Sequence, residues 1–177
     1  MEYARLGETG LIVSRLALGT MTFGKGVGGR GAAIFKVDDQ GAEALVGQAF
    51  DAGINFFNTA DAYAEGRSEE MLGRALGSRR KDAVIATKVG NRTGGGLTDI
   101  GLSRRHILMA AEESLRRMGT DWIDVYLFHK IDPYTPLEEM LEAANQLVSS
   151  GKVRYVGFSN WPAWMAAKAV GIQNARG

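Results

Sequence analysis

The sequence predicts an α/β fold, in which a parallel sheet is covered by helices. Short runs rich in Val, Ile and Phe recur along the chain, and segments with apolar residues at helical spacing lie between them. Because each predicted strand is followed by a predicted helix, we expect right-handed crossovers and parallel neighbouring strands. The chain has 177 residues, of which 45% are hydrophobic, and no change of composition divides it. It therefore predicts a single domain over residues 1–177.

The alternation of strands and helices follows a predicted N-terminal hairpin. Glu2 to Leu6 and Leu11 to Leu16 flank a Gly-containing turn at 8–10. Strands are predicted over residues 16–23, 54–59, 83–89, 123–128 and 153–158. Helices are predicted over residues 42–52, 68–76 and 137–150, with a long one from Ser103 and a last one from Pro162. Ser68 is predicted to cap its helix.

Composition excludes several classes of function. The formal net charge is +1, from 21 basic and 20 acidic residues, which argues against nucleic acid or an anionic membrane as a partner. The chain has no cysteine, so disulfides, thiolate metal sites and thiol nucleophiles are excluded, and no spacing typical of metal ligands appears. The sequence shows no secretory signal pattern and no long apolar run. We expect a cytoplasmic protein whose partner is a small molecule or another protein.

Polar side chains end or follow the predicted strands. Asn58 and Tyr63 follow the second strand, Lys88 ends the third and His129 follows the fourth. The fifth strand is followed by a serine and an asparagine. Because the carboxyl ends of parallel strands share one edge, these side chains are predicted to meet in one cleft.

A tyrosine and a lysine in one cleft can act together as a proton donor. A reaction that leaves negative charge on a substrate oxygen, such as hydride addition to a carbonyl carbon, needs a donor of this kind. Tyrosine, with a pKa of about 10, is a weak acid at neutral pH. A lysine ammonium about 4 Å away stabilises the phenolate by roughly 4 kcal/mol at an effective dielectric constant near 20. Tyr63 and Lys88 match these two roles, and a neutral His129 can orient or polarise the same oxygen.

Four longer segments carry a more specific pattern, namely FFNTADAYAEGRSEEMLG, AVIATKVG, WIDVYLFHKIDPYTPLEE and VRYVGFSNW. In this order and at this spacing they resemble the signatures of the aldo-keto reductase family. RLGETGLIVSRLALGTMTFG resembles the family's opening hairpin and first strand. The resemblance implies a (β/α)8 barrel of the TIM type, present here as the hairpin and about five βα units. It also implies NAD(P)H-dependent reduction of aldehydes or ketones to alcohols.

The resemblance also implies a cofactor and the residues that bind it. NADPH is the expected cofactor, with NADH as the alternative, and the expected substrate is a small carbonyl compound. Ser159 and Asn160 match the family's residues that hold the nicotinamide carboxamide. Gly19, Thr20 and Met21 match the stretch beside the cofactor at the end of the first strand. For Met21, packing inside the barrel is an equally good explanation.

The catalytic motif departs from the family at one position. The resemblance makes Tyr63 the proton donor, Lys88 the residue that tunes it and His129 the residue that orients the substrate. The family's aspartate, five residues before the tyrosine, is replaced by Asn58, and Asp61 lies three residues further along. We therefore do not expect Asp61 to replace it. An amide accepts a hydrogen bond from Lys88 but supplies no charge, so either Lys88 loses its proton more easily or Tyr63 becomes more acidic.

The number of strands leaves two hypotheses about function. A closed barrel has eight strands and typically about 250 residues, whereas five strands are predicted in these 177 residues. The first and fifth strands would then be apolar edges, which favour self-association or pairing with a missing C-terminal half. One hypothesis is a reductase whose activity is weak or lost. The alternative is an inactive half-barrel that acts as a binding or assembly module.

Two further residue patterns have simple structural explanations. Gly24, Gly26 and Gly29 satisfy G-x-G-x-x-G, but AAIFKVDDQ separates them from the next helical pattern, so a Rossmann dinucleotide site is not expected. His106, in the first turn of its predicted helix, is expected at the surface.

Overall fold

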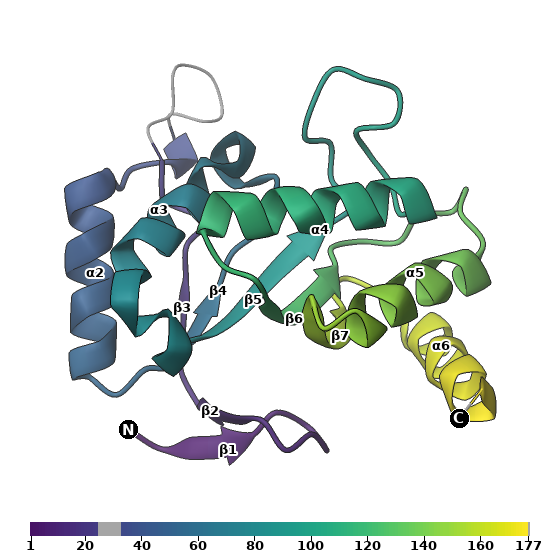
Figure 1. Cartoon of the computed structure of the whole chain (residues 1–177), viewed down its shortest axis with the longest axis horizontal. Helices are drawn as coiled ribbons and strands as arrows, with labels where there is room; N and C mark the ends of the chain where they lie inside the picture. Colours follow the sequence, from purple (N-terminus) through teal and green to yellow (C-terminus); the bar gives the residue numbers. More distant parts are fainter. Residues whose placement is uncertain (25–32, 177) are drawn as a thin grey trace.

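The protein is described by a computed structural model that covers residues 1–24 and 33–176. Five parallel strands form one sheet in sequential order, from β3 to β7. Helices cover one face of this sheet, and a two-stranded hairpin lies at one end of it (Figure 1). The predicted α/β class, with a parallel sheet and alternating helices, is thereby confirmed. The strands of the sheet are β3 (Ala17–Gly19), β4 (Phe56–Asn58), β5 (Val84–Val89), β6 (Ile123–Phe128) and β7 (Val153–Phe158).

Local chemistry sets the ends of the helices. Asp38 accepts a hydrogen bond from the backbone N–H of Gly41 at the start of α2, and Ser103 accepts one from His106 at the start of α4. Helix α4 ends at Gly119, whose φ of 62° is left-handed. Within residues 1–24 and 33–176, none of the helices has both the length and the apolar character needed to cross a bilayer. The helical segments are α2 (Asp39–Asp51), η1 (Tyr63–Gly66), α3 (Arg67–Leu76), η2 (Gly77–Asp82), α4 (Arg104–Met118), α5 (Leu137–Ser149) and α6 (Ala163–Arg176).

The main hydrophobic core lies between the sheet and the helices. Phe57, Ile85 and Tyr126 come from β4, β5 and β6, and all three are fully buried. Leu72 of α3 and Ile107 of α4 pack into the same cluster. Burial of these side chains fixes which face of each strand points outward, and so it also fixes where the strand ends place their polar residues.

A smaller apolar cluster lies on the opposite face of the sheet. It joins Val13 of the hairpin to Val84, Ala86 and Val125 of β5 and β6. The hairpin lies toward the amino-terminal ends of the strands, away from their carboxyl-terminal rim (Figure 1). The rim is therefore the end of the sheet that the hairpin leaves open. The hairpin strands are β1 (Tyr3–Arg5) and β2 (Ile12–Ser14).

The first two strands of the parallel sheet are shorter than predicted. The strand predicted over 16–23 is reduced to the three residues of β3, because the chain turns directly after it. The backbone N–H of Phe23 donates to the carbonyl of Thr20 at 2.9 Å, and Phe23 then forms an isolated parallel bridge with Val37. The strand predicted over 54–59 is likewise reduced to the three residues of β4.

Two residues are not where the sequence placed them. Ser68 does not cap α3, because Gly66 is the N-cap and the Ser68 hydroxyl donates instead to the carbonyl of Thr20 at 2.8 Å. His106 is not a surface residue, since only 6% of it is exposed. It lies one helical turn before Ala110, which is also buried, so its ring is on the face of α4 that packs inward.

The glycine-rich pattern is only partly covered by the structure. Gly24 has a φ of 127°, in the region that favours glycine. Gly26 and Gly29 lie outside the described residues.

Candidate active site

Strand register brings the predicted catalytic residues to one rim. Asn58 ends β4, and Lys88 stands next to last in β5, where it is paired with Leu127 of β6. The backbone N–H of His129 donates to the carbonyl of Val89 at 2.8 Å, which holds His129 directly beyond β6. Three consecutive strands thus deliver their polar residues to neighbouring positions, as the sequence predicts.

We call Asn58, Tyr63, Lys88 and His129 the rim cluster. The ammonium group of Lys88 lies at its centre. It donates to the carbonyl oxygen of Thr59 at 2.7 Å, to the side-chain oxygen of Asn58, and to the hydroxyl of Tyr63 at 3.3 Å. An ammonium group has three N–H donors, so these three acceptors satisfy it. Asn58 therefore lies within hydrogen-bonding reach of Lys88, as expected, and keeps that contact without supplying a charge.

Tyr63 lies between the lysine and the histidine. The Lys88 nitrogen is 4.9 Å from the centre of the Tyr63 ring, and the His129 ring meets the Tyr63 ring edge to face with centroids 5.8 Å apart. Tyr63 begins η1, where Ala64 and Glu65 have left-handed φ values of 49° and 57°. Such backbone strain costs on the order of 1–3 kcal/mol for each residue, so the surrounding packing has to hold this turn in place.

Burial sets the protonation states in the rim cluster. Desolvation lowers the pKa of Lys88 to about 8, although the negative charges of Asp61 and Glu69 oppose it. Desolvation also raises the pKa of Tyr63. It lowers the pKa of His129 to about 4, with the positive charge of Lys88 adding to the effect. Near neutral pH the cluster therefore holds a protonated tyrosine, a mostly charged lysine and a neutral histidine. Of the two effects expected from Asn58, the structure favours easier deprotonation of Lys88.

Asn91 lies against the ring of His129, and it was not predicted from the sequence as a site residue. Its amide nitrogen lies 3.0 Å from Nδ1 of His129. With that amide as the donor, Nδ1 accepts and the ring proton is on Nε2. Asn91 follows β5 by two residues, so its position at the end of a strand was the only signal in the sequence that pointed to it.

The fifth strand adds a donor and an acceptor to the rim. The backbone N–H of Ser159 donates to the carbonyl of Phe128 at 2.8 Å, and Asn160 has a left-handed φ of 57°. The Asn160 amide nitrogen donates to the carbonyl of His129 at 2.9 Å and to the Ser159 hydroxyl at 3.0 Å. The Ser159 hydroxyl proton and the Asn160 amide oxygen form no other hydrogen bond within the described residues. They provide the donor and the acceptor that a carboxamide requires.

Gly19, Thr20 and Met21, at the end of β3 and directly after it, differ in their exposure. Gly19 and Met21 are exposed at the rim, and a Cβ added to Gly19 would meet no atom of residues 1–24 or 33–176 within 4 Å. Thr20 is buried, and its backbone N–H donates to the carbonyl of Asn58 at 2.9 Å. Its hydroxyl lies 2.8 Å from that of Ser68. Gly19 and Met21 are thus accessible to a ligand, whereas Thr20 holds β3 against β4.

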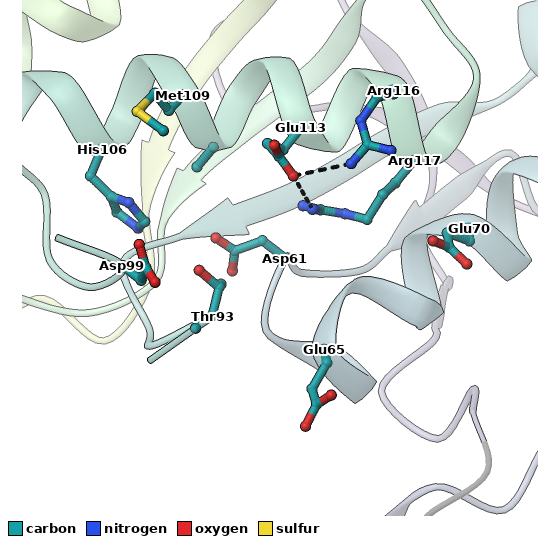
Figure 2. Close-up of a pocket in the computed structure, with 12 residues that line it drawn as sticks. Asp61, Glu65, Glu70, Thr93, Asp99, His106, Met109, Glu113, Arg116 and Arg117 are labelled. Carbon is teal, nitrogen blue, oxygen red and sulfur yellow. Dashed lines mark hydrogen bonds and ion pairs between the residues drawn. The ribbon is translucent and has the colours of Figure 1, made fainter. Parts of the chain in front are cut away.

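The structure also reveals a buried carboxyl group beside the rim cluster. Asp61 follows β4, and its backbone N–H donates to the carbonyl of Lys88 at 3.1 Å. Only 1% of Asp61 is exposed, and it lines a pocket between η1 and α3 on one side and α4 on the other (Figure 2). We call this the outer pocket, and it is lined by Asp61, Glu65, Glu70, Thr93, Gly94, Asp99, His106, Met109, Ala110, Glu113, Arg116 and Arg117.

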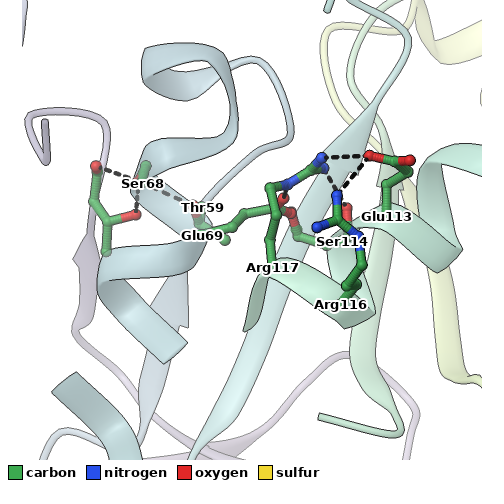
Figure 3. Close-up of polar contacts among 9 residues, drawn as sticks. Thr59, Ser68, Glu69, Glu113, Ser114, Arg116 and Arg117 are labelled. Carbon is green, nitrogen blue, oxygen red and sulfur yellow. Dashed lines mark hydrogen bonds and ion pairs between the residues drawn. The ribbon is translucent and has the colours of Figure 1, made fainter. Parts of the chain in front are cut away.

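A buried ion pair joins α3 to α4 beside the outer pocket. Glu69 of α3 is fully buried and accepts from the Arg117 guanidinium of α4 at 2.6 Å (Figure 3). The hydroxyl of Thr87 in β5 donates to the other oxygen of Glu69. Gly66 is needed next to this pair, because an added Cβ would come within 2.6 Å of the Arg117 side chain. The pair therefore links α3, α4 and the sheet just behind Lys88.

Comparison with known proteins identifies the family. The model of the aldo/keto reductase family matches residues 15–176. The chain belongs to the aldo/keto reductase family. The four segments that resemble this family in the sequence are the same ones that build the rim.

Three relatives match at least 90% of the chain. It is 40% identical over 98% of its length to a probable voltage-gated potassium channel subunit beta of Oryza sativa subsp. japonica. It is 40% identical over 93% of its length to versiconal hemiacetal acetate reductase of Aspergillus parasiticus. An aldo-keto reductase from Bacillus halodurans, solved in its holo form, superposes with a TM-score of 0.78 and 36% identity over 90% of this chain.

The shared part is about half of these relatives. The matches cover 51% of the rice protein, 52% of the Aspergillus reductase and 50% of the solved Bacillus chain. The fold is therefore a partial (β/α)8 barrel of the aldo/keto reductase type. Its outer strands β3 and β7 each have a neighbour on one side within the five-stranded sheet.

Proposed function

We propose that this rim reduces aldehydes or ketones to alcohols with a nicotinamide cofactor, NADPH in the first place. The observation that carries the proposal is the hydrogen bond from Lys88 to the hydroxyl of Tyr63, with the ring of His129 against Tyr63. The family supports oxidoreductase chemistry, and the Aspergillus relative is a reductase by name.

Each residue of the rim cluster has a definable part in that reaction. The cofactor, when bound, supplies the hydride. Tyr63 donates the proton to the carbonyl oxygen, and the Lys88 ammonium, 3.3 Å away, stabilises the phenolate that remains. At an effective dielectric constant near 20 that stabilisation is on the order of 5 kcal/mol. His129, neutral and with its proton on Nε2, orients the carbonyl oxygen through a hydrogen bond.

The described residues fit a nicotinamide group. Ser159 and Asn160, after β7, offer the matching donor and acceptor for its carboxamide. Gly19, at the end of β3 on the other edge of the sheet, leaves open space for a ligand. Met21, 48% exposed, is available to contact the ring. These residues would hold the cofactor face against the rim that carries Tyr63.

We expect the chain by itself to reduce a reactive aldehyde feebly at most. The resemblance to the family implies that the adenosine phosphate end of the cofactor is held by the half of the relatives that these 177 residues do not match. The outer strands of the sheet would favour self-association instead. The alternative of an assembly module without catalysis gains little support, because the lysine, tyrosine and histidine of the rim keep the contacts that proton transfer requires.

A completed barrel tests this proposal. The chain would be joined to the C-terminal half of the Bacillus halodurans relative at the structurally matched position, and this hybrid is called the completed barrel below. We expect oxidation of NADPH that depends on added aldehyde, at a rate typical of enzymes, about 1 to 1,000 turnovers per second. NADH serves as the comparison cofactor. A folded completed barrel that binds NADPH but transfers no hydride to any small aldehyde would contradict the proposal.

A further inference from the structure

The outer pocket is a cavity of about 390 Å³, separate from the rim cluster. Among the described residues that line it, Asp61 is the one buried carboxyl group, and the carboxylates of Asp99 and Glu113 lie on either side of it (Figure 2). A volume near 400 Å³ is within the range of pockets that hold small molecules, which is about 300–1,000 Å³. The pocket is therefore large enough for a metabolite-sized ligand.

Two buried polar groups in this pocket have no hydrogen-bond partner among residues 1–24 and 33–176. Neither oxygen of the Asp61 carboxyl group, nor Nε2 of His106, forms a hydrogen bond within the described residues. The backbone N–H of Ala62 is near enough to lower the Asp61 pKa but is not in hydrogen-bonding geometry. Asp61 is 1% exposed and His106 is 6% exposed. Buried polar groups are nearly always satisfied, so this pair indicates that something else donates to them.

The surroundings of Asp61 explain its protonation. Its pKa is raised to about 8, chiefly by desolvation and in smaller part by the negative charge of Glu69. Arg117 and Lys88 oppose this with positive charge. Tyr126, from β6, is fully buried close to the same group. Asp61 is therefore mainly neutral at pH 7, and it becomes a carboxylate when a positive charge binds beside it.

The charge of the pocket favours a cation. Its lining includes five carboxyl side chains against two guanidinium groups. Both guanidinium groups already pair with Glu113, at 3.2 and 3.3 Å, so neither is free for an anion. In the described part of the chain no group of three His, Cys, Asp or Glu side chains is arranged to hold a metal ion. An organic cation remains.

We propose that the outer pocket binds a small organic cation with N–H donors, a primary ammonium or a guanidinium group, which Asp61 receives as a carboxylate. Both unpartnered oxygens of Asp61 can then accept hydrogen bonds, and the neutral ring of His106 offers one more acceptor. The carboxylates nearer the opening attract the cation from solution. Binding displaces the proton of Asp61 into solvent, so the complex gains a salt bridge and loses one proton.

Titration calorimetry with agmatine tests this proposal, since agmatine carries a guanidinium at one end and an ammonium at the other. The purified chain would be titrated at pH 7 and low salt, in two buffers with different heats of ionisation. We expect one site for each chain and release of close to one proton. Asp61→Asn should weaken binding at least tenfold and abolish the proton release. Asp121→Asn, a matched change at an exposed residue outside this pocket, should leave both unchanged.

The chain has two histidines, one in the pocket and one at the rim, which gives a second measurement on the unaltered protein. Agmatine should shift the ring signals of His106 in a nuclear magnetic resonance spectrum and leave those of His129 in place. The proposal is wrong if tetramethylammonium, a cation without N–H donors, binds as well as agmatine. It is also wrong if the folded chain shows no agmatine binding at millimolar concentration, or if the signals of His129 alone shift. None of these outcomes depends on reductase activity.

Discussion

The rim cluster and the outer pocket are neighbours, because the backbone N–H of Asp61 donates to the carbonyl of Lys88. They differ in whether their buried titratable side chains have hydrogen-bond partners. At the rim, the three donors of Lys88 meet three acceptors, and Nδ1 of His129 has Asn91 beside it. In the outer pocket, Asp61 and His106 are as deeply buried and have no partner within the described residues. An unsatisfied buried group costs about 1–3 kcal/mol.

The difference indicates that the rim cluster already has the hydrogen bonds that proton transfer needs, whereas the polar groups of the outer pocket need a bound proton or ligand as a partner. The rim is preorganised, so its groups need no rearrangement before a proton moves from Tyr63. In the outer pocket, burial raises the pKa of Asp61 to about 8, so the carboxyl group favours keeping its proton near pH 7. Changes at the rim should therefore alter turnover, whereas changes at Asp61 should alter the response to pH.

The largest effect is expected from removing the proton donor. In the completed barrel, Tyr63→Phe should lower kcat for aldehyde reduction by about 10²–10⁴, the usual contribution of a positioned general acid. The ring remains, so its contact with His129 should persist. Steady-state kinetics measures the loss, and fluorescence titration with NADPH checks that cofactor binding is unchanged. Turnover within threefold of the parent would show that another group donates the proton.

The next effect concerns Asp61 and the dependence of stability on pH. The carboxyl pKa is about 8 when folded and about 4 when unfolded, so between these values the folded state holds an extra proton. The free energy of unfolding therefore falls as pH rises from about 4 to about 8, by up to about 1.4 kcal/mol for each pH unit, because the folded protein must lose this proton.

Asp61→Asn removes that titration in the completed barrel. The advantage of the variant over the parent should grow from pH 5 to pH 7.5, as measured by urea unfolding at each pH. Asp121→Asn, at an exposed position, serves as the control and should show a constant difference. A constant difference for Asp61→Asn as well would mean that Asp61 is ionised in the folded protein.

A smaller effect is expected from restoring the family's aspartate. Asn58→Asp places a carboxylate against the Lys88 ammonium, which should raise the Lys88 pKa above about 8 and move the alkaline limb of the kcat/KM profile to higher pH. We expect turnover to rise by about one factor of ten, equal to about 1.4 kcal/mol. Asn58→Ala is the control, because it removes the amide that accepts from Lys88 without adding a negative charge. Unchanged or lower turnover in folded Asn58→Asp would make Asn58 an adapted residue of this site.

The rim could be predicted from the sequence because its make-up depends only on the order of the strands and on where each strand ends. In a sequential parallel sheet, the end of each strand fixes which residues share the rim, and the ends of β5 and β6 are visible as apolar runs that stop at Lys88 and His129. Exact strand length mattered little, since β3 and β4 are shorter than predicted and the rim is still assembled.

The outer pocket could not be predicted in the same way. The burial of Asp61 and His106 depends on how α3 and α4 pack and on a left-handed turn at Ala64 and Glu65. The pattern of apolar residues in the sequence does not predict how these two helices pack against each other. His106 was wrongly placed at the surface because a residue in the first turn of a helix is usually exposed, and here the turn faces inward.

The smallest effect is expected at Asn91, which the sequence did not single out. Asn91→Ala removes the donor to Nδ1 of His129, a neutral hydrogen bond with a net value of about 0.5–1.5 kcal/mol. In the completed barrel we expect kcat/KM for aldehyde to fall by about tenfold or less, because the histidine ring is oriented less tightly, while NADPH affinity stays the same. Asn145→Ala is the matched control, since Asn145 pairs with Gln173 between α5 and α6, away from the rim. An equal fall in both variants would mean that Asn91 acts on stability alone, whereas a fall confined to Asn91→Ala would show that the rim depends on the tautomer it holds.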